Sequence, residues 1–156
     1  MHGIITVWGA MLALSLCACA QGGNHSERLK TETHRNGLVI NIADTLKVEQ
    51  TEGGFHIYPP NGLDRRSPVE ATAELHAGEP APPGEWPEEK RVGERTVHYR
   101  IDESDGGSGG REYDMQAWEP YPGGYILYRE RIQSEGKPDF ELLWGLVEGT
   151  RAPGTK

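Results

Sequence analysis

The residues best suited to chemistry lie between Asp102 and Asp114, where carboxylates surround a glycine-rich segment. Residues 102–110 include three carboxylates and four glycines, and two more acidic residues follow within four positions. Glycine lets a backbone approach another surface closely, and carboxylates can pair with arginine or lysine or share a calcium ion with a partner. The alternative is a solvated loop that binds nothing. We predict a partner-binding site, with calcium a candidate at its interface, made of Asp102, Glu103, Ser104, Asp105, Glu112 and Asp114.

Catalytic and metal-binding patterns are weak by comparison. The glycine-rich segment lacks the alternating ligands and closing Glu of an EF-hand, and no Gly-Lys-Ser/Thr follows it as in a phosphate loop. His56, His76 and His98 have no zinc-ligand spacing, and no Gly-x-Ser-x-Gly elbow is present. Glu70 and Glu74 could form a glycosidase pair only if folding brought them together across a substrate. We therefore predict that the protein is not an enzyme and has no resident metal or cofactor.

Strands with one buried face must position the predicted site. Apolar and polar residues alternate in 96–102 and in 111–118, which is the period of a half-buried strand. The sequence Tyr121-Pro122-Gly123-Gly124 favours a tight turn, and a further strand is predicted at 125–131. We expect an antiparallel meander in which residues 103–110 form a long acidic loop.

Earlier segments predict more of the same sheet. A strand is expected at 38–42, a hairpin at 47–51 and 55–58, and a one-sided strand at 69–76. Residues 78–87 contain four prolines and are therefore expected to be an extended surface connection. One domain is favoured, because about 50 residues before this segment would bury too little surface alone.

The end of the chain changes to a helical period. A helix is predicted to open at Pro138-Asp139 and to end at Gly149, with one apolar stripe that packs on the buried face of the sheet. The predicted class is α+β: an antiparallel β-sheet meander with a C-terminal α-helix packed on one face. The domain is expected to span 34–151, and 152–156 to be a disordered tail. The stripe consists of Phe140, Leu143, Trp144 and Val147.

The N-terminus indicates export. Ile4–Leu16 is an apolar run of 13 residues, too short to span a bilayer, which takes about 20, but suited to a signal peptide. Leu16-Cys17-Ala18-Cys19 resembles a bacterial lipobox, which implies that Cys19 is acylated, with palmitate among the chains. Ala20 and Gln21 imply retention in the outer membrane. We predict a signal peptide at 1–18, a flexible tether at 19–33 and a lipid-anchored periplasmic protein; an ordinary cleaved secretory signal is the alternative.

Composition narrows the choice of partner. The net charge is −8, from 24 acidic and 16 basic residues. Nucleic acid is therefore excluded as a favoured partner, since phosphate contacts need a basic surface. A basic protein fits better, because opposite charges raise encounter rates. Both cysteines lie in the leader region, so the folded part has no disulfide and no thiol nucleophile.

Two resemblances add to this reading. The order of Asn36-Gly37-Leu38, the hairpin, the proline-rich crossing, the meander and the final helix resembles the Mog1/PsbP fold. The phrase His34-Arg35-Asn36-Gly37-Leu38 and the closing helix, in an acidic and cysteine-poor chain, are similar to type VI secretion immunity lipoproteins that neutralise muramidase effectors. Ala43-Asp44-Thr45-Leu46 stands where the Mog1/PsbP family often has Pro-x-x-Trp.

The resemblance implies an immunity protein that binds a peptidoglycan-degrading muramidase in the periplasm and touches the membrane only through its lipid. A muramidase cleft is an open groove that depends on carboxylates, and a rigid sheet with a polar loop can plug such a groove. The alternative is an accessory or ligand-binding module of an envelope complex.

Overall fold

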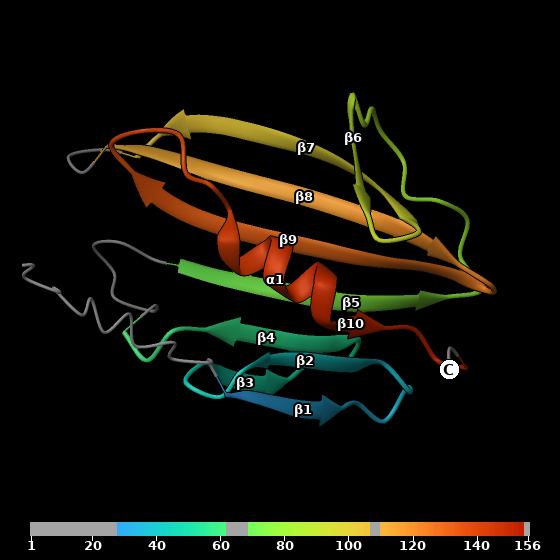
Figure 1. Cartoon of the computed structure of the whole chain (residues 1–156). Helices are drawn as coiled ribbons and strands as arrows, with labels where there is room; N and C mark the ends of the chain where they lie inside the picture. Colours follow the sequence, from blue (N-terminus) through green and yellow to red (C-terminus); the bar gives the residue numbers. More distant parts are fainter. Residues whose placement is uncertain (1–27, 62–68, 107–109, 155–156) are drawn as a thin grey trace, which may run out of the picture.

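The computed structural model describes residues 28–61, 69–106 and 110–154, in which a large antiparallel sheet is covered on one face by a helix and a small sheet (Figure 1). The large sheet has, in spatial order, β3 (Lys47–Gln50), β4 (Gly54–Tyr58), β5 (Val69–Ala77), β9 (Gly124–Ser134), β8 (Arg111–Tyr121), β7 (Arg95–Asp105) and β6 (Glu88–Val92). The small sheet consists of β1 (Leu29–Thr33), β2 (Val39–Ala43) and β10 (Thr150–Arg151), and the helix is α1 (Glu141–Gly149). The predicted α+β class, with an antiparallel sheet and a C-terminal helix on one face, is confirmed.

Alternation along the strands separates a buried face from a face we call the open face, which lies on the side of the large sheet opposite α1. In Figure 1 the helix lies in front of the sheet, so the open face looks away from the reader. The buried face, the small sheet and α1 share one apolar core. Its fully buried side chains include Phe55, Ile57, Val97, Met115, Tyr128, Ile40 and Leu143.

The predicted turns form where the sequence places them. β3 and β4 pair as a hairpin, and β8 and β9 pair up to Tyr121 and Gly124. Gly124 has a φ of 152°, and a Cβ there would overlap the carbonyl oxygen of His76 on β5. A glycine is needed because two backbones approach each other closely at this corner.

The predicted bounds of the acidic loop and of the tether are wrong. The loop expected at 103–110 is shorter, because β7 continues to Asp105 and pairs with β8 from Arg111 onward. Backbone hydrogen bonding extends a strand whether or not its side chains are polar. The tether expected at 19–33 is also too long, since Leu29–Thr33 forms β1 and pairs with β2. The predicted signal peptide and Cys19 lie outside the described residues.

The helix begins later than predicted. Phe140 precedes it with a φ of 55°, so Pro138 and Asp139 lie outside the helix. Its buried residues are Leu143, Leu146 and Val147. Trp144 is only partly buried, at the edge of the core. In the described part of the chain, no helix is both long and apolar enough to cross a membrane.

Side chains from the large sheet satisfy both ends of α1. At the N-terminus, which has no side-chain cap of its own, Glu130 Oε2 of β9 accepts a hydrogen bond from the Leu143 amide at 2.8 Å. At the C-terminus, Arg95 of β7 donates to the carbonyl oxygens of Val147 at 2.7 Å and Thr150 at 3.3 Å. An acidic group at the N-terminus and a basic group at the C-terminus both suit the helix dipole. The helix is thereby fixed to the sheet by polar as well as apolar contacts.

Candidate partner-binding face

The open face is ordered in rows, because the strand register sets residues of neighbouring strands side by side. Towards the β7–β8 connection, Ser104 lies opposite Glu112, and Asp102 lies opposite Asp114. The predicted contact residues of the open face therefore occupy two adjacent rows. Beyond Asp114 the second row continues with Arg131 on β9 and Glu70 on β5.

Carboxylates of these rows are paired with arginines of the same face. Asp114 accepts hydrogen bonds from Arg129 Nε at 2.8 and 2.9 Å and also pairs with its terminal nitrogen. The hydrogen bonds from Asp114 raise the pKa of Arg129. Glu112 lies 3.3 Å from Arg131 Nε. Surface pairs of this kind contribute on the order of 1 kcal/mol or less and exchange readily with other partners.

The register divides the predicted site between the two faces. Asp102, Ser104, Glu112 and Asp114 share the open face, whereas Glu103 and Asp105 have the alternate orientation along β7. Glu103 forms an ion pair with Arg111 on that other side. The sequence analysis had placed Glu103, Ser104 and Asp105 in a loop, with Asp102, Glu112 and Asp114 on the strands beside it. The separation of Glu103 and Asp105 from the others is a consequence of the longer strand.

The residues considered for catalysis have structural partners. Each of the three histidines contacts glutamates: His56 Nε2 lies 2.9 Å from Glu70, His76 Nδ1 lies 3.2 Å from Glu79, and His98 Nδ1 lies 3.1 Å from Glu89. Among residues 28–61, 69–106 and 110–154, no group of three or more His, Cys, Asp or Glu side chains could hold a metal ion.

Two buried carboxylates lie on the helix side of the sheet. Glu119 Oε1 accepts hydrogen bonds from Tyr128 at 2.5 Å and Arg95 at 2.7 Å, and burial raises its pKa. Burial also raises the pKa of Glu130 to about 7. Both carboxylates bind groups of the protein itself, and their contacts hold α1 rather than a substrate.

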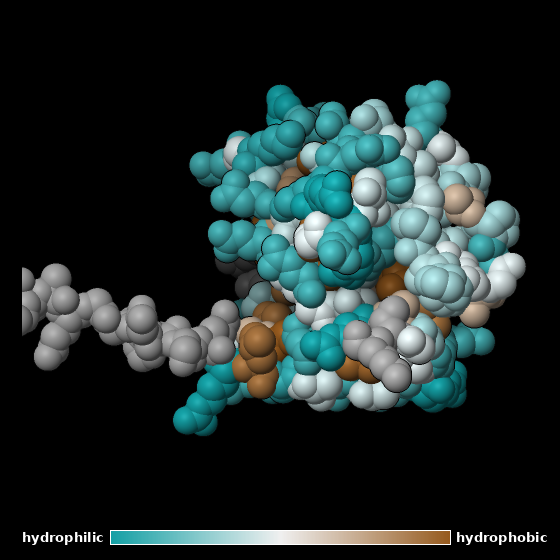
Figure 2. Space-filling view, turned by 45° about the vertical axis from the view of Figure 1, so that its right-hand side comes forward, coloured by the Kyte–Doolittle hydropathy of each residue, from teal (hydrophilic) through white to brown (hydrophobic). Residues whose placement is uncertain are grey.

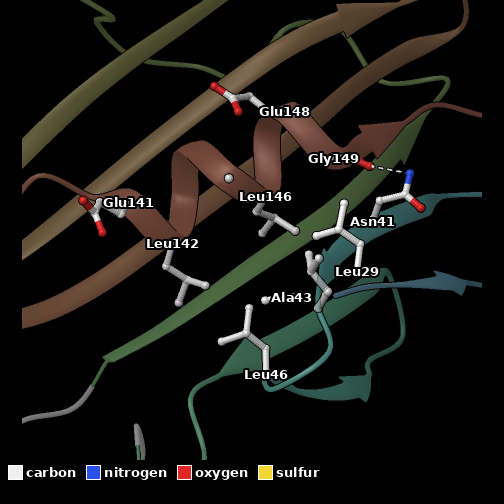
Figure 3. Close-up of a pocket in the computed structure, with 11 residues that line it drawn as sticks. Leu29, Asn41, Ala43, Leu46, Glu141, Leu142, Leu146, Glu148 and Gly149 are labelled. Atoms are coloured by element: carbon white, nitrogen blue, oxygen red, sulfur yellow. Dashed lines mark hydrogen bonds between the residues drawn. The ribbon is translucent and has the colours of Figure 1, made fainter. Parts of the chain in front are cut away.

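An apolar groove of about 560 Å³ runs beside α1 on the covered side of the large sheet. Figure 3 shows leucines of α1 and of the small-sheet side converging on it, and the Asn41 side chain bonded to the Gly149 carbonyl at 3.4 Å. Figure 2 shows hydrophobic atoms at the surface mainly in the lower half of the molecule, the half that holds β1 to β4 in Figure 1. The groove is lined chiefly by Leu29, Ala43, Leu46, Leu142 and Leu146.

Sequence reasoning missed a set of aromatic side chains on the open face, which we call the aromatic row. They lie at the end of the face away from Glu112, and their rings contact one another across four strands and the proline-rich segment. A signal was present, since Trp118 continues the polar positions 112, 114 and 116 of β8. The row consists of His76, Trp86, His98, Trp118 and Tyr125.

Comparison with known proteins gives the family. Residues 39–151 match the model of the type six secretion immunity 3 domain, Tsi3. The chain is 33% identical over 143 residues to a protein of Pseudomonas aeruginosa described as immune protein Tsi3, covering 91% of this chain and 93% of the relative. An immunity protein acts by binding its cognate effector, which disfavours the envelope accessory module and agrees with the predicted lack of enzymatic activity. The chain belongs to the Tsi3 family of type VI secretion immunity proteins: it is an inhibitor that binds and neutralises an effector, not an enzyme.

Proposed function

We propose that this protein is a periplasmic lipoprotein that covers the substrate groove of a peptidoglycan-degrading muramidase effector. The observation that carries the proposal is the open face, where Asp102, Ser104, Glu112 and Asp114 lie together at one end of an ordered sheet. A surface that is ordered before binding loses little conformational entropy on docking. Family membership supports an effector as the partner, and the open face supports occlusion as the means.

The charges of the open face suit a groove that works with carboxylates. Asp114 and Glu112 can pair with basic residues on the groove walls, while the arginines that hold them now, Arg129 and Arg131, can turn to the catalytic carboxylates. Exchange of partners costs little, because pairs at a surface are weak in water. Acidic and basic side chains of the open face would then both form ion pairs with the effector.

The proposed periplasmic location of the protein rests on its leader sequence. Cys19, preceded by Ala18, is the proposed acylation site, with the outer membrane as the destination. Labelling with a palmitate analogue should be lost in Cys19→Ser and kept in Cys17→Ser. Retained labelling in Cys19→Ser would mean that another residue is acylated, and a wild type without labelling would contradict the lipid anchor.

Calcium at the interface also belongs to the proposal. Because the described residues hold no metal cluster of their own, Glu112 or Asp102 would share the ion with ligands supplied by the effector. Calorimetry of the complex with calcium and with a chelator tests this. Equal affinity in both conditions would contradict a bridging ion.

The fold likeness to the Mog1/PsbP family remains part of the proposal as well. The sheet order with its C-terminal helix supports it, and superposition on a structure of that family is its test.

The decisive experiment combines capture and enzymology. The domain from residue 28 onward, with an affinity tag, is used to capture partners from periplasm, which are identified by mass spectrometry. The captured protein is then assayed for peptidoglycan cleavage with and without the domain. We expect a muramidase that loses activity at equimolar domain. A captured effector that cuts no glycan, or one that stays active when bound, would contradict the proposal.

A further inference from the structure

The aromatic row is a continuous cluster of rings from separate parts of the chain, in which Tyr125 is buried and the other four side chains are half-buried. The His98 ring stacks on Trp118 with centroids 4.7 Å apart, and the His76 ring stacks on Tyr125 at 4.5 Å with planes only 4° apart. Trp118 meets Tyr125 edge to face at 6.2 Å, and Trp86 of the proline-rich segment meets Trp118 at 6.4 Å. These contacts lie on the face opposite α1 and are therefore not needed to attach the helix.

Three glutamates border the aromatic row, and we call them the acidic rim: Glu74, Glu79 and Glu89. Their side chains are 39%, 56% and 63% exposed. Within the described part of the chain, their ion pairs are formed with His76 and His98 and not with arginine or lysine. The rim thus differs from the neighbouring rows, where arginines neutralise the carboxylates, and it carries negative charge that a partner can use.

The surface already binds one cation of the chain itself. The guanidinium carbon of Arg100 lies 4.9 Å from the centre of the Trp86 ring. A guanidinium group over an indole face gains cation–π attraction, and tryptophan is the best ring for it. An indole at this end of the open face therefore accepts a guanidinium, and the half-buried rings of Trp118 and His98 have the same chemistry to offer a cation from outside.

An indole nitrogen of the aromatic row makes no hydrogen bond within the described residues. This nitrogen is Trp118 Nε1, a buried donor for which the described residues supply no acceptor. A buried donor without an acceptor is costly, and a partner that supplies acceptors recovers that cost. The patch that offers carboxylates to a cation thus also offers the Trp118 indole N–H to a partner's carbonyl oxygen.

We infer that the aromatic row is the anchor of the effector interface and that it receives an arginine or lysine side chain of the effector. The aliphatic stem and cationic head lie over Trp118 and His98, and the charge meets Glu74, Glu79 or Glu89 of the acidic rim. Interfaces concentrate their binding energy in a few Trp, Tyr and Arg residues surrounded by weaker contacts. The inference rests on the proposed function for the partner and adds the point of attachment and its chemistry.

A basic protein explains the row better than a sugar does. Saccharides also stack on aromatic rings, and their hydroxyls can donate hydrogen bonds to carboxylates, but a neutral sugar gains no charge attraction from the three glutamates. A cationic side chain uses the rings and the rim together, and the net charge of −8 favours its approach.

The test measures affinity for the captured effector, in a catalytically silent form, by calorimetry or biolayer interferometry. Trp118→Ala should weaken binding by about 30-fold or more, as expected of a central interface residue. Glu79→Lys with Glu89→Lys changes only exposed side chains, so folding is spared, and it should slow association at low salt by about tenfold or more. Raising the ionic strength should reduce the difference from the wild type.

Matched controls lie on the helix side. Trp144→Ala removes a tryptophan that packs on Tyr99 there, and Glu148→Lys reverses an exposed charge on α1; neither should change affinity by more than about twofold. Circular dichroism and thermal unfolding check the fold of each variant.

The outcomes separate this inference from the proposed function. If the wild type fails to inhibit the captured effector, the proposed function is wrong. If the wild type inhibits the effector, but Trp118→Ala and the Glu79→Lys, Glu89→Lys variant both bind as tightly as the wild type, the anchor is elsewhere and only this inference is overturned. A titration with chitohexaose, followed by Trp fluorescence, gives the remaining outcome: quenching that Trp118→Ala abolishes, with effector affinity unchanged, would assign the row to glycan and overturn the inference.

Discussion

Glu130 should make the protein more stable as the pH falls from about 7 to about 4.5, the reverse of ordinary acid destabilisation. The side chain is 2% exposed, and burial raises its pKa to about 7, against the usual 4.5. The hydrogen bond from the Leu143 amide lowers this pKa, and the nearby Glu141 carboxylate raises it, but burial dominates. At pH 8 the folded state must keep a charge that the unfolded chain exposes to water.

The magnitude follows from the shift in pKa. A pKa of about 7 in place of 4.5 corresponds to about 3 kcal/mol of destabilisation well above pH 7, since a change of one in pKa is about 1.4 kcal/mol. Below the pKa of the folded state the carboxyl becomes protonated, so this cost falls progressively until the unfolded chain is protonated as well. Glu130→Gln keeps an oxygen that can accept from Leu143 but carries no charge. It should therefore be more stable than the wild type at pH 8 by about 3 kcal/mol and nearly equal to it at pH 4.

The assay is urea unfolding of the wild type and Glu130→Gln at a series of pH values from 4 to 8.5. With a slope of about 2 kcal/mol/M, the midpoints should differ by about 1.5 M at pH 8 and converge under acid conditions. Taking the difference between the two proteins cancels the contribution of Glu119 and of the histidines. Glu141→Gln, which changes an exposed carboxylate of the same helix, should show a much smaller effect. A midpoint difference that is constant with pH would refute the reasoning.

Two further substitutions test the parts that hold the fold. Arg95→Met should destabilise the protein by about 3 kcal/mol, because it leaves the buried Glu119 without its cation and removes the hydrogen bond that Arg95 donates to the Val147 carbonyl of α1. Thermal unfolding measures this loss, and a value below about 1 kcal/mol would contradict the prediction. Gly124→Ala should lower the free energy of unfolding by on the order of 2–4 kcal/mol, because its Cβ would overlap the His76 carbonyl. Gly78→Ala is the control: it also has a positive φ but open space around it, so it should cost less. Equal losses of stability would show that the close approach at Gly124 does not matter.

The alternating strands could be predicted from the sequence because one face of each is buried and the other is not. The β8 pattern, in which Tyr113, Met115 and Ala117 alternate with polar residues, was sufficient for this. β6 was missed because its first four residues are all exposed and charged, so that it has no alternation. Edge strands are often charged in this way, which prevents pairing with other chains.

The site was predictable only in part, because strand register is a property of two segments and not of one. Nothing in the sequence of 103–105 showed that β7 would continue to pair with β8, and that pairing turns Glu103 away from Asp102. The aromatic row has the same origin, since His98 meets Trp118 only through the register of β7 with β8. The proline-rich segment then places Trp86 against it, a contact that no local pattern specifies.

The two faces of the large sheet use their charges in different ways, and this difference predicts what mutations will do. On the helix side, Glu119 and Arg95 form a hydrogen-bonded ion pair beside the core, so removing one of them leaves its partner uncompensated at a cost of several kcal/mol. Glu130 differs above pH 7, because Gln keeps the acceptor for Leu143 and removes a buried charge. On the open face, pairs such as Arg129 with Asp114 are in contact with water and contribute little to folding. Substitutions behind the sheet should therefore change stability before they affect neutralisation, whereas those on the open face should weaken effector binding while the unfolding midpoint hardly changes. A set of open-face variants that unfold early but bind normally would show that this division is wrong.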